Sequence, residues 1–141
     1  MSRHISRSER DTQQIAAQLA STLAPGDVVA LFGGLGMGKT AFVRGLAQGM
    51  GLDPTQVSSP TFALVHDYAG KLYHFDMYRA PDEHSLHLTG FYDYLDASGI
   101  LAVEWSENIA DLLPPGAIRV AISLGKSQDE RVIEIDRRAA P

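Results

Sequence analysis

The chain has 141 residues, 45% of them hydrophobic and 21% charged, which suits one globular domain with an ordinary core. It contains no cysteine, and this excludes disulfides, thiolate nucleophiles and zinc sites built from cysteine. A formal net charge of −5 argues against strong direct binding of RNA or DNA, because such binding usually needs a basic surface that neutralises phosphates.

Hydropathy also argues against a membrane location. No apolar run approaches the ~20 residues that a membrane-spanning helix needs. The polar start of the chain, residues 1–11, lacks the apolar centre of a signal peptide. We therefore expect a cytoplasmic protein that does not contact membranes.

The first predicted elements are a strand, a helix and a second strand. A short edge strand is expected at residues 3–6 and a helix at residues 9–23, whose apolar side chains recur on one face. Ser6 and Glu9 are placed to form a capping box at the start of this helix. The strand at residues 28–32 is apolar on both faces, which is typical of the centre of a sheet covered on both sides.

A glycine-rich loop follows this strand and carries the strongest signal in the sequence. Residues 33–40 read Gly-Gly-Leu-Gly-Met-Gly-Lys-Thr and match the pattern G-x-x-x-x-G-K-T of a phosphate-binding loop (P-loop). The pattern predicts binding of ATP or GTP. Lys39 is expected to reach the β- and γ-phosphates, and the Thr40 hydroxyl to bind Mg²⁺. The residues expected to surround the phosphates are Gly36, Met37, Gly38, Lys39, Thr40 and Ala41.

The remaining patterns predict further helices and several strands. The expected helices lie at residues 39–50, 82–94 and shortly before 113, and the expected strands lie on either side of Ala69-Gly70 and at residues 100–103, 117–124 and 131–135. Strands alternate with helices in the first part of the chain, and hairpins follow later. This order indicates an α/β, three-layer, P-loop NTPase-like fold with a mixed central sheet. A single nucleotide-binding domain is expected over residues 1–141, with residues 136–141 as a frayed, solvated tail.

Two acids are candidates for completing a phosphoryl-transfer site. In this fold class, an acid for Mg²⁺ or water lies at the end of a strand beside the P-loop. Glu104 directly follows the apolar run at residues 100–103 and should emerge beside Thr40. Asp76 lies on the more polar face of its strand. The alternatives are a helix N-terminal carboxylate for Glu104 and a solvated or arginine-paired acid for Asp76.

Two further segments have both a functional and a structural interpretation. Ser58-Ser59-Pro60-Thr61 is either a switch-like segment that presents the Thr61 hydroxyl to Mg²⁺ or the γ-phosphate, or a turn leading into a strand. Trp105, the only tryptophan, is either a core residue or an aromatic anchor at a partner surface or at the mouth of the site.

Five stretches together resemble the TsaE family, the small P-loop ATPases of bacterial tRNA threonylcarbamoyladenosine (t6A) biosynthesis. The stretches are Gly36-Met37-Gly38-Lys39-Thr40, Ser59-Pro60-Thr61-Phe62, Tyr73-His74-Phe75-Asp76-Met77-Tyr78-Arg79, Asp93-Tyr94-Leu95 and Val103-Glu104-Trp105. Their order and spacing match the family over nearly the whole chain. The loop departs from the usual family sequence in having Gly34 in place of Asp and Met37 in place of Ala.

The resemblance implies an ATP-hydrolysing accessory subunit with ATP and Mg²⁺ as cofactors. Such a subunit docks on the t6A-forming heterodimer of the TsaB/TsaD type, which modifies position 37 of tRNAs that read ANN codons, and meets tRNA only indirectly. The site residues carried over are Lys39 and Thr40 for phosphate and Mg²⁺, Glu104 as a Mg²⁺ ligand, Asp76, Thr61 and Trp105 as functionally important positions, and Glu9 and Thr12 near the adenine. Asp76, Glu104 and Thr61 are the catalytic candidates.

Functions of other classes stay open at this point. A small-molecule kinase should carry a lid of several arginines, whereas only Arg44 and Arg79 are expected near the site. A nucleotide-gated interaction module would bind ATP with little hydrolysis. A GTPase is a weaker variant, because the chain has no N-K-x-D guanine signature.

Overall fold

A computed structural model describes residues 1–34, 36–58, 60, 65–78, 90–95 and 98–137. The helices are α1 (Glu9–Ala20), α2 (Lys39–Gly49) and α4 (Phe91–Leu95), with 3₁₀ segments η1 (Pro54–Gln56) and η2 (Ser106–Leu112). The strands are β1 (Ser2–Ser6), β2 (Val28–Phe32), β3 (Val65–Tyr68), β4 (Leu72–Asp76), β5 (Ile100–Glu104), β6 (Ile118–Leu124) and β7 (Arg131–Arg137). Most of the predicted helix at residues 82–94 lies outside the described residues.

The strands form one seven-stranded sheet with the order β1-β7-β6-β2-β5-β4-β3. Strand β2 pairs in parallel with β5 on one side and with β6 on the other, and β5 pairs in parallel with β4. The outer pairs β1/β7, β6/β7 and β3/β4 are antiparallel. The predicted mixed sheet is therefore confirmed, and the apolar strand β2 lies near its centre.

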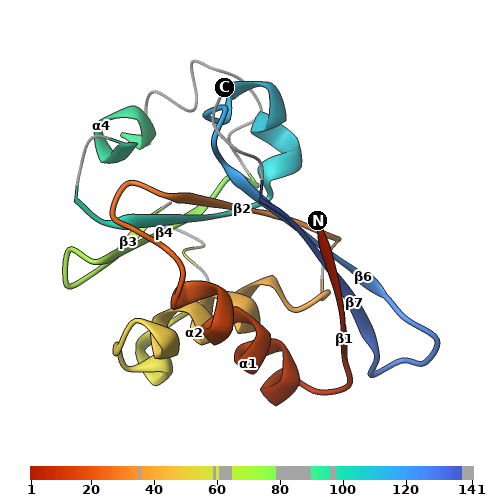
Figure 1. Cartoon of the computed structure of the whole chain (residues 1–141). Coiled ribbons are helices and arrows are strands. Elements are labelled where there is room, and N and C mark those ends of the chain that lie inside the picture. Colours follow the sequence, from red (N-terminus) through yellow and green to blue (C-terminus); the bar gives the residue numbers. More distant parts are fainter. Residues whose placement is uncertain (35, 59, 61–64, 79–89, 96–97, 138–141) are drawn as a thin grey trace.

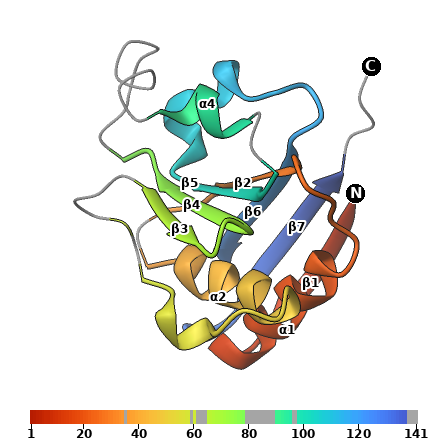
Figure 2. The same cartoon turned by 90° about the vertical axis from the view of Figure 1, so that its left-hand side faces the viewer.

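Helices cover both faces of the sheet, as Figures 1 and 2 show. Helices α1 and α2 pack on one face and enclose a large core that includes Phe42, Leu46 and Val120. On the other face, α4 and η2 cover a smaller core around Phe75, Phe91 and Val103. This arrangement confirms the three-layer α/β fold. Within the described residues, no helix is long and apolar enough to cross a membrane.

The start of α1 differs from the predicted capping box. Ser8, not Ser6, is the N-cap, because its hydroxyl accepts a 3.0 Å hydrogen bond from the backbone N–H of Asp11. Asp11 in turn accepts from the N–H of Arg7 at 2.9 Å, so the pair satisfies two backbone donors. The Ser6 side chain is buried and hydrogen-bonds Thr12 Oγ1 at 2.6 Å instead. It therefore ties β1 to the helix and does not cap it.

The C-terminal strand is longer than expected. β7 continues to Arg137, with Asp136 opposite Arg119 and Arg137 opposite Ile118 on β6. The Arg137 guanidinium also donates to the Thr22 carbonyl at 2.9 Å. The prediction of a frayed tail is therefore wrong for residues 136 and 137, because ladder pairing with β6 outweighs their polarity; residues 138–141 lie outside the described part.

Candidate functional site

Three chain segments meet at one edge of the sheet because their strands are parallel. The loop at residues 33–38 leaves the carboxyl end of β2, and β4 and β5 end at the same edge with Asp76 opposite Glu104. Ala30 on β2 lies opposite Val103 on β5, so Glu104 emerges beside the loop. In parallel α/β sheets this edge is where ligands bind.

The backbone conformation at Gly36 and Gly38 of the loop favours glycine. Gly36 and Gly38 have φ angles of 76° and 103°, a region that L-amino acids with side chains rarely adopt. Gly38 is the N-cap of α2 and places no side chain over the first turn of that helix. The N–H groups of this turn have no partner within the helix, and together with the positive end of the helix dipole they form a site suited to an anion.

The Lys39 side chain is folded back over its own loop. It is buried, its Nζ donates to the Gly33 carbonyl at 2.5 Å, and Nζ lies 3.4 Å from the centroid of the Trp105 ring. Burial lowers the pKa of the Lys39 ammonium below its usual value, although the charges of Glu107 and Glu104 act in the opposite direction. The ammonium is thus held at the loop by a carbonyl, an aromatic face and nearby acids.

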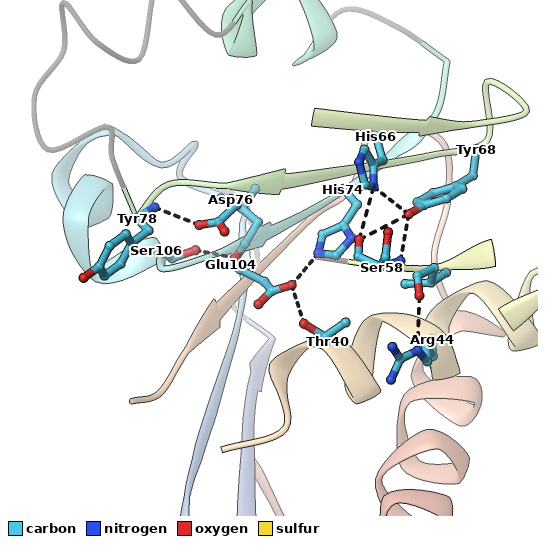
Figure 3. Close-up of polar contacts among 12 residues, drawn as sticks. Thr40, Arg44, Ser58, His66, Tyr68, His74, Asp76, Tyr78, Glu104 and Ser106 are labelled. Carbon is cyan, nitrogen blue, oxygen red and sulfur yellow. Dashed lines mark hydrogen bonds and ion pairs between the residues drawn. The ribbon is translucent and has the colours of Figure 1, made fainter. Parts of the chain in front are cut away.

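Glu104 is the centre of a compact polar cluster drawn in Figure 3. Its side chain is 4% exposed, and its Oε2 accepts a 3.0 Å hydrogen bond from the Thr40 hydroxyl. The same oxygen lies 2.5 Å from Nε2 of His74, a side chain that is fully buried. Two side chains from different elements therefore contact one carboxylate oxygen, while the other points away from His74 in Figure 3.

Asp76, Tyr78 and Trp105 form the outer wall of the site. An Asp76 carboxylate oxygen accepts from the N–H of Tyr78 at 2.9 Å (Figure 3). The Tyr78 ring is 62% exposed and lies 5.0 Å, centroid to centroid, from the Trp105 ring. Trp105 adopts a left-handed backbone conformation with φ of 59°. Trp105 packs against the smaller core, as the structural alternative predicts, and it also lines the cavity described below.

These residues enclose a cavity of about 560 Å³. Its walls are Glu9, Gly36, Met37, Gly38, Lys39, Thr40, Ala41, Arg44, Asp76, Tyr78, Glu104 and Trp105. A smaller cavity of about 160 Å³ adjoins it and shares Glu9, Gly36, Met37, Gly38 and Ala41. The additional walls of the smaller cavity are Ser8, Thr12, Asp129 and Arg131. Together they form a cavity over the first turn of α2 and a smaller recess beside α1.

The structure brings most predicted site residues to these two cavities. The loop residues, Asp76 and Glu104 line the larger one, Glu9 lines both, and Thr12 lines only the smaller one. Thr12 is buried, and its hydroxyl is bonded to Ser6. Thr61 lies outside the described residues.

Glu107 and His74 are among the residues at the site that were not predicted from the sequence. Glu107 accepts a 2.9 Å hydrogen bond from the N–H of Gly33, and His74 contacts Glu104. The sequence offers two signals for His74: strand alternation places it on the same face as Asp76, and it lies in one of the stretches that resemble the TsaE family. Their partners depend on how β4 and η2 lie against β5 and the loop, and the sequence does not reveal this.

The strand–loop–helix unit, with acids at the neighbouring strand ends, defines a P-loop domain of the α/β class. The family described as "Threonylcarbamoyl adenosine biosynthesis protein TsaE" matches residues 6–133. The chain belongs to this TsaE family, which is involved in t6A biosynthesis.

Relatives support this assignment over most of the chain. A protein of Aquifex aeolicus, named tRNA threonylcarbamoyladenosine biosynthesis protein TsaE, is 44% identical over 73% of this chain and 75% of its own length. The protein of the same name from Bacillus subtilis is 38% identical over 87% of this chain and 77% of its own length. The crystal structure of YdiB from Bacillus subtilis superposes with a TM-score of 0.73 and 31% identity, over 94% of this chain and 82% of that one.

Proposed function

We propose that this chain is an ATP-binding and ATP-hydrolysing subunit of cytoplasmic t6A biosynthesis, acting on the heterodimer of the TsaB/TsaD type that modifies position 37 of tRNAs reading ANN codons. Membership of the TsaE family supports the pathway. The observation that carries the ATPase proposal is the convergence of Lys39, Thr40 and Glu104 in one cavity.

The loop supplies the groups needed to hold phosphates. Gly36, Met37, Gly38, Lys39 and Thr40 line the larger cavity, where their backbone N–H groups would bind phosphate oxygens, and Lys39 is the basic residue of this segment. To pair with a phosphate, the Lys39 ammonium has to leave the Gly33 carbonyl and the Trp105 ring. The cost of removing that cation from its present contacts is offset by charge-assisted hydrogen bonds to phosphate oxygens.

Thr40 and Glu104 fit a magnesium ion in donor chemistry. Both offer oxygen atoms, the type that Mg²⁺ prefers, and they are already within 3.0 Å of each other. Because the Thr40 hydroxyl directs its proton to Glu104, its lone pairs are left to bind a cation. Mg²⁺, when bound, would neutralise negative charge that develops on the phosphates. Asp76, opposite Glu104 in the sheet, is placed to orient water or a metal-bound ligand.

The substitution Lys39→Ala tests the proposal. ATP and GTP binding are measured by calorimetry, and phosphate release is measured with the chain alone, with the t6A-forming heterodimer, and with the heterodimer plus tRNA. We expect ATP binding and partner-stimulated hydrolysis in the wild type and the loss of both in the variant, because no other side chain of the loop is basic. Lys71→Ala is the matched control, since Lys71 is exposed and lies outside the lining of both cavities.

The same measurements separate the other function classes. Binding without hydrolysis in the presence of heterodimer and tRNA would favour a nucleotide-gated interaction module. Transfer of phosphate to an added small molecule would favour a kinase. If the wild type binds no nucleotide, or if Lys39→Ala binds and hydrolyses ATP like the wild type, the proposal is wrong.

A further inference from the structure

A fully buried histidine, His74, lies next to the proposed metal ligand Glu104 and is not needed for the phosphate contacts proposed above. His74 lies in the middle of β4 with a side chain exposure of 0%, on the face of the sheet that it shares with the apolar Leu72. An aliphatic residue would fill such a position without burying polar nitrogen atoms. The polar contacts of the His74 nitrogens therefore indicate the role of the imidazole at this position.

Only one of its two nitrogens has a hydrogen-bond partner. Nε2 lies 2.5 Å from Glu104 Oε2, whereas Nδ1 is buried and has no partner among the residues that the structure describes. Burying an imidazole lone pair without a hydrogen-bond donor costs less free energy than burying an imidazole N–H without an acceptor. The tautomer that fits is the neutral ring with its proton on Nε2, donated to the Glu104 carboxylate.

The His74 ring also contacts a side chain of the neighbouring strand β3. The His66 ring packs against it edge to face, with centroids 6.5 Å apart. His66 itself is fixed through Nδ1, which lies 3.1 Å from the Ser58 carbonyl and 3.1 Å from the Tyr68 hydroxyl (Figure 3). The His66 ring therefore restricts rotation of the His74 imidazole that contacts Glu104.

We propose that His74 is a positioning residue for the metal site: it fixes Glu104 Oε2 so that the other carboxylate oxygen faces the cavity. Thr40 donates to the same oxygen from the first turn of α2, so the two donors act together on one atom. A carboxylate held in this way loses less freedom when it binds a cation, and such supporting contacts are typically worth 10- to 100-fold in metal affinity. This inference rests on the proposed function, because it presupposes a Mg²⁺-dependent nucleotide site.

Two variants of similar shape isolate the donated hydrogen bond. In His74→Gln the amide nitrogen can take the place of Nε2 and donate to Glu104, whereas His74→Met has a comparable length but no donor. The readout is the affinity for a fluorescent ATP analogue with Mg²⁺ and in EDTA, together with Mn²⁺ binding followed by electron paramagnetic resonance. Thermal unfolding of each variant checks that it is folded.

We expect His74→Met to weaken Mn²⁺ binding, and the gain in nucleotide affinity caused by Mg²⁺, by about 10- to 100-fold. Affinity in EDTA should stay at the wild-type value, and His74→Gln should recover most of the loss. In a Glu104→Gln background, His74→Met should have no further effect, because the carboxylate that it positions is gone. A purely structural role would lower affinity in EDTA as well and would add to the effect of Glu104→Gln.

Two results would overturn the inference while leaving the proposed function intact. One is wild-type metal dependence in a folded His74→Met variant. The other is an NMR spectrum of the wild-type imidazole nitrogens that places the proton on Nδ1, a measurement that does not require any variant to fold. A wild type that binds neither nucleotide nor Mn²⁺ would instead overturn the proposed function and this inference with it.

Discussion

The Thr40 hydroxyl and the Glu104 carboxylate are joined by a 3.0 Å hydrogen bond, although they are 64 positions apart in the chain. The bond links the first turn of α2 to the carboxyl end of β5. Any group that draws the Thr40 oxygen toward a phosphate therefore acts on Glu104 as well. This hydrogen bond therefore couples the phosphate-binding loop to the proposed metal ligand.

Glu104→Gln should lower hydrolysis much more than nucleotide binding. The amide keeps the shape of the side chain but removes the charge that would hold a divalent cation, whereas phosphate contacts come from the loop. We expect phosphate release with the heterodimer to fall by about 10²- to 10³-fold, with ATP affinity in EDTA within about threefold of wild type. Glu134→Gln on β7, outside both cavities, is the control, and an equal loss of affinity and rate would contradict the assignment.

Trp105 should report nucleotide binding directly. Lys39 Nζ lies 3.4 Å from the centroid of its ring, and Trp105 is the only tryptophan, so withdrawal of the ammonium toward a phosphate changes the surroundings of a single fluorophore. A titration with ATP and Mg²⁺ should change the emission of the wild type in a saturable way. The Lys39→Ala variant should start from a different emission and show no change. A flat wild-type signal despite calorimetric binding would show that Lys39 stays against the ring.

Glu107 should weaken nucleotide binding in the wild type. Its carboxylate accepts from the N–H of Gly33 and is the acid with the largest effect on the pKa of Lys39. Such a charge repels an incoming triphosphate, at a cost of roughly 1 kcal/mol for exposed groups near a protein surface. Glu107→Gln should therefore tighten ATP binding by about fivefold. Asp111→Asn, also exposed on η2, serves as control, and unchanged or weaker binding by Glu107→Gln would refute the repulsion.

The parts of this fold that follow local rules were predictable. The apolar strand β2, the glycine-rich loop and the hairpin around Ala69-Gly70 each carry their own signal, and the structure has all three. The placement of Glu104 beside Thr40 followed from the parallel arrangement alone. These signals need only neighbouring residues or the general topology.

The features that sequence reasoning missed depend on distant pairing. The contact between His74 and Glu104 requires that β4 pair with β5, and 30 positions separate the two residues. Residues 136 and 137 look like a tail until their pairing with β6 is known. Ser6 and Ser8 are both suitable caps by composition, and the choice between them is made by the buried bond from Ser6 to Thr12. Tertiary contacts override local preference in each case.

The isolated chain should bind tRNA weakly. With a net charge of −5, it gains little from the release of counterions that drives most protein–RNA association. In a gel-shift titration at physiological salt, we expect no complex between tRNA and the isolated chain at micromolar protein concentrations. A complex that contains the chain should form only when the t6A-forming heterodimer is added. As a control, the titration of the isolated chain is repeated at higher salt, which would weaken any electrostatic binding to tRNA. Tight, salt-sensitive binding without partners would contradict indirect contact with tRNA.

Gly45 should be required for the packing of α2 against α1. A Cβ built at this position lies 2.3 Å from the Gln13 carbonyl oxygen and 2.6 Å from Ala16 Cβ, so the two helices would have to separate. Helix propensity alone would make Gly45→Ala more stable by about 1 kcal/mol, whereas overpacking typically destabilises by about 1–3 kcal/mol. We therefore expect a lower free energy of unfolding in urea, measured by circular dichroism. Gly34→Ala should unfold like the wild type, because no described residue apart from its chain neighbours has a heavy atom within 4 Å of the added carbon. A stabilised Gly45→Ala protein would contradict close packing of α1 against α2 at this position.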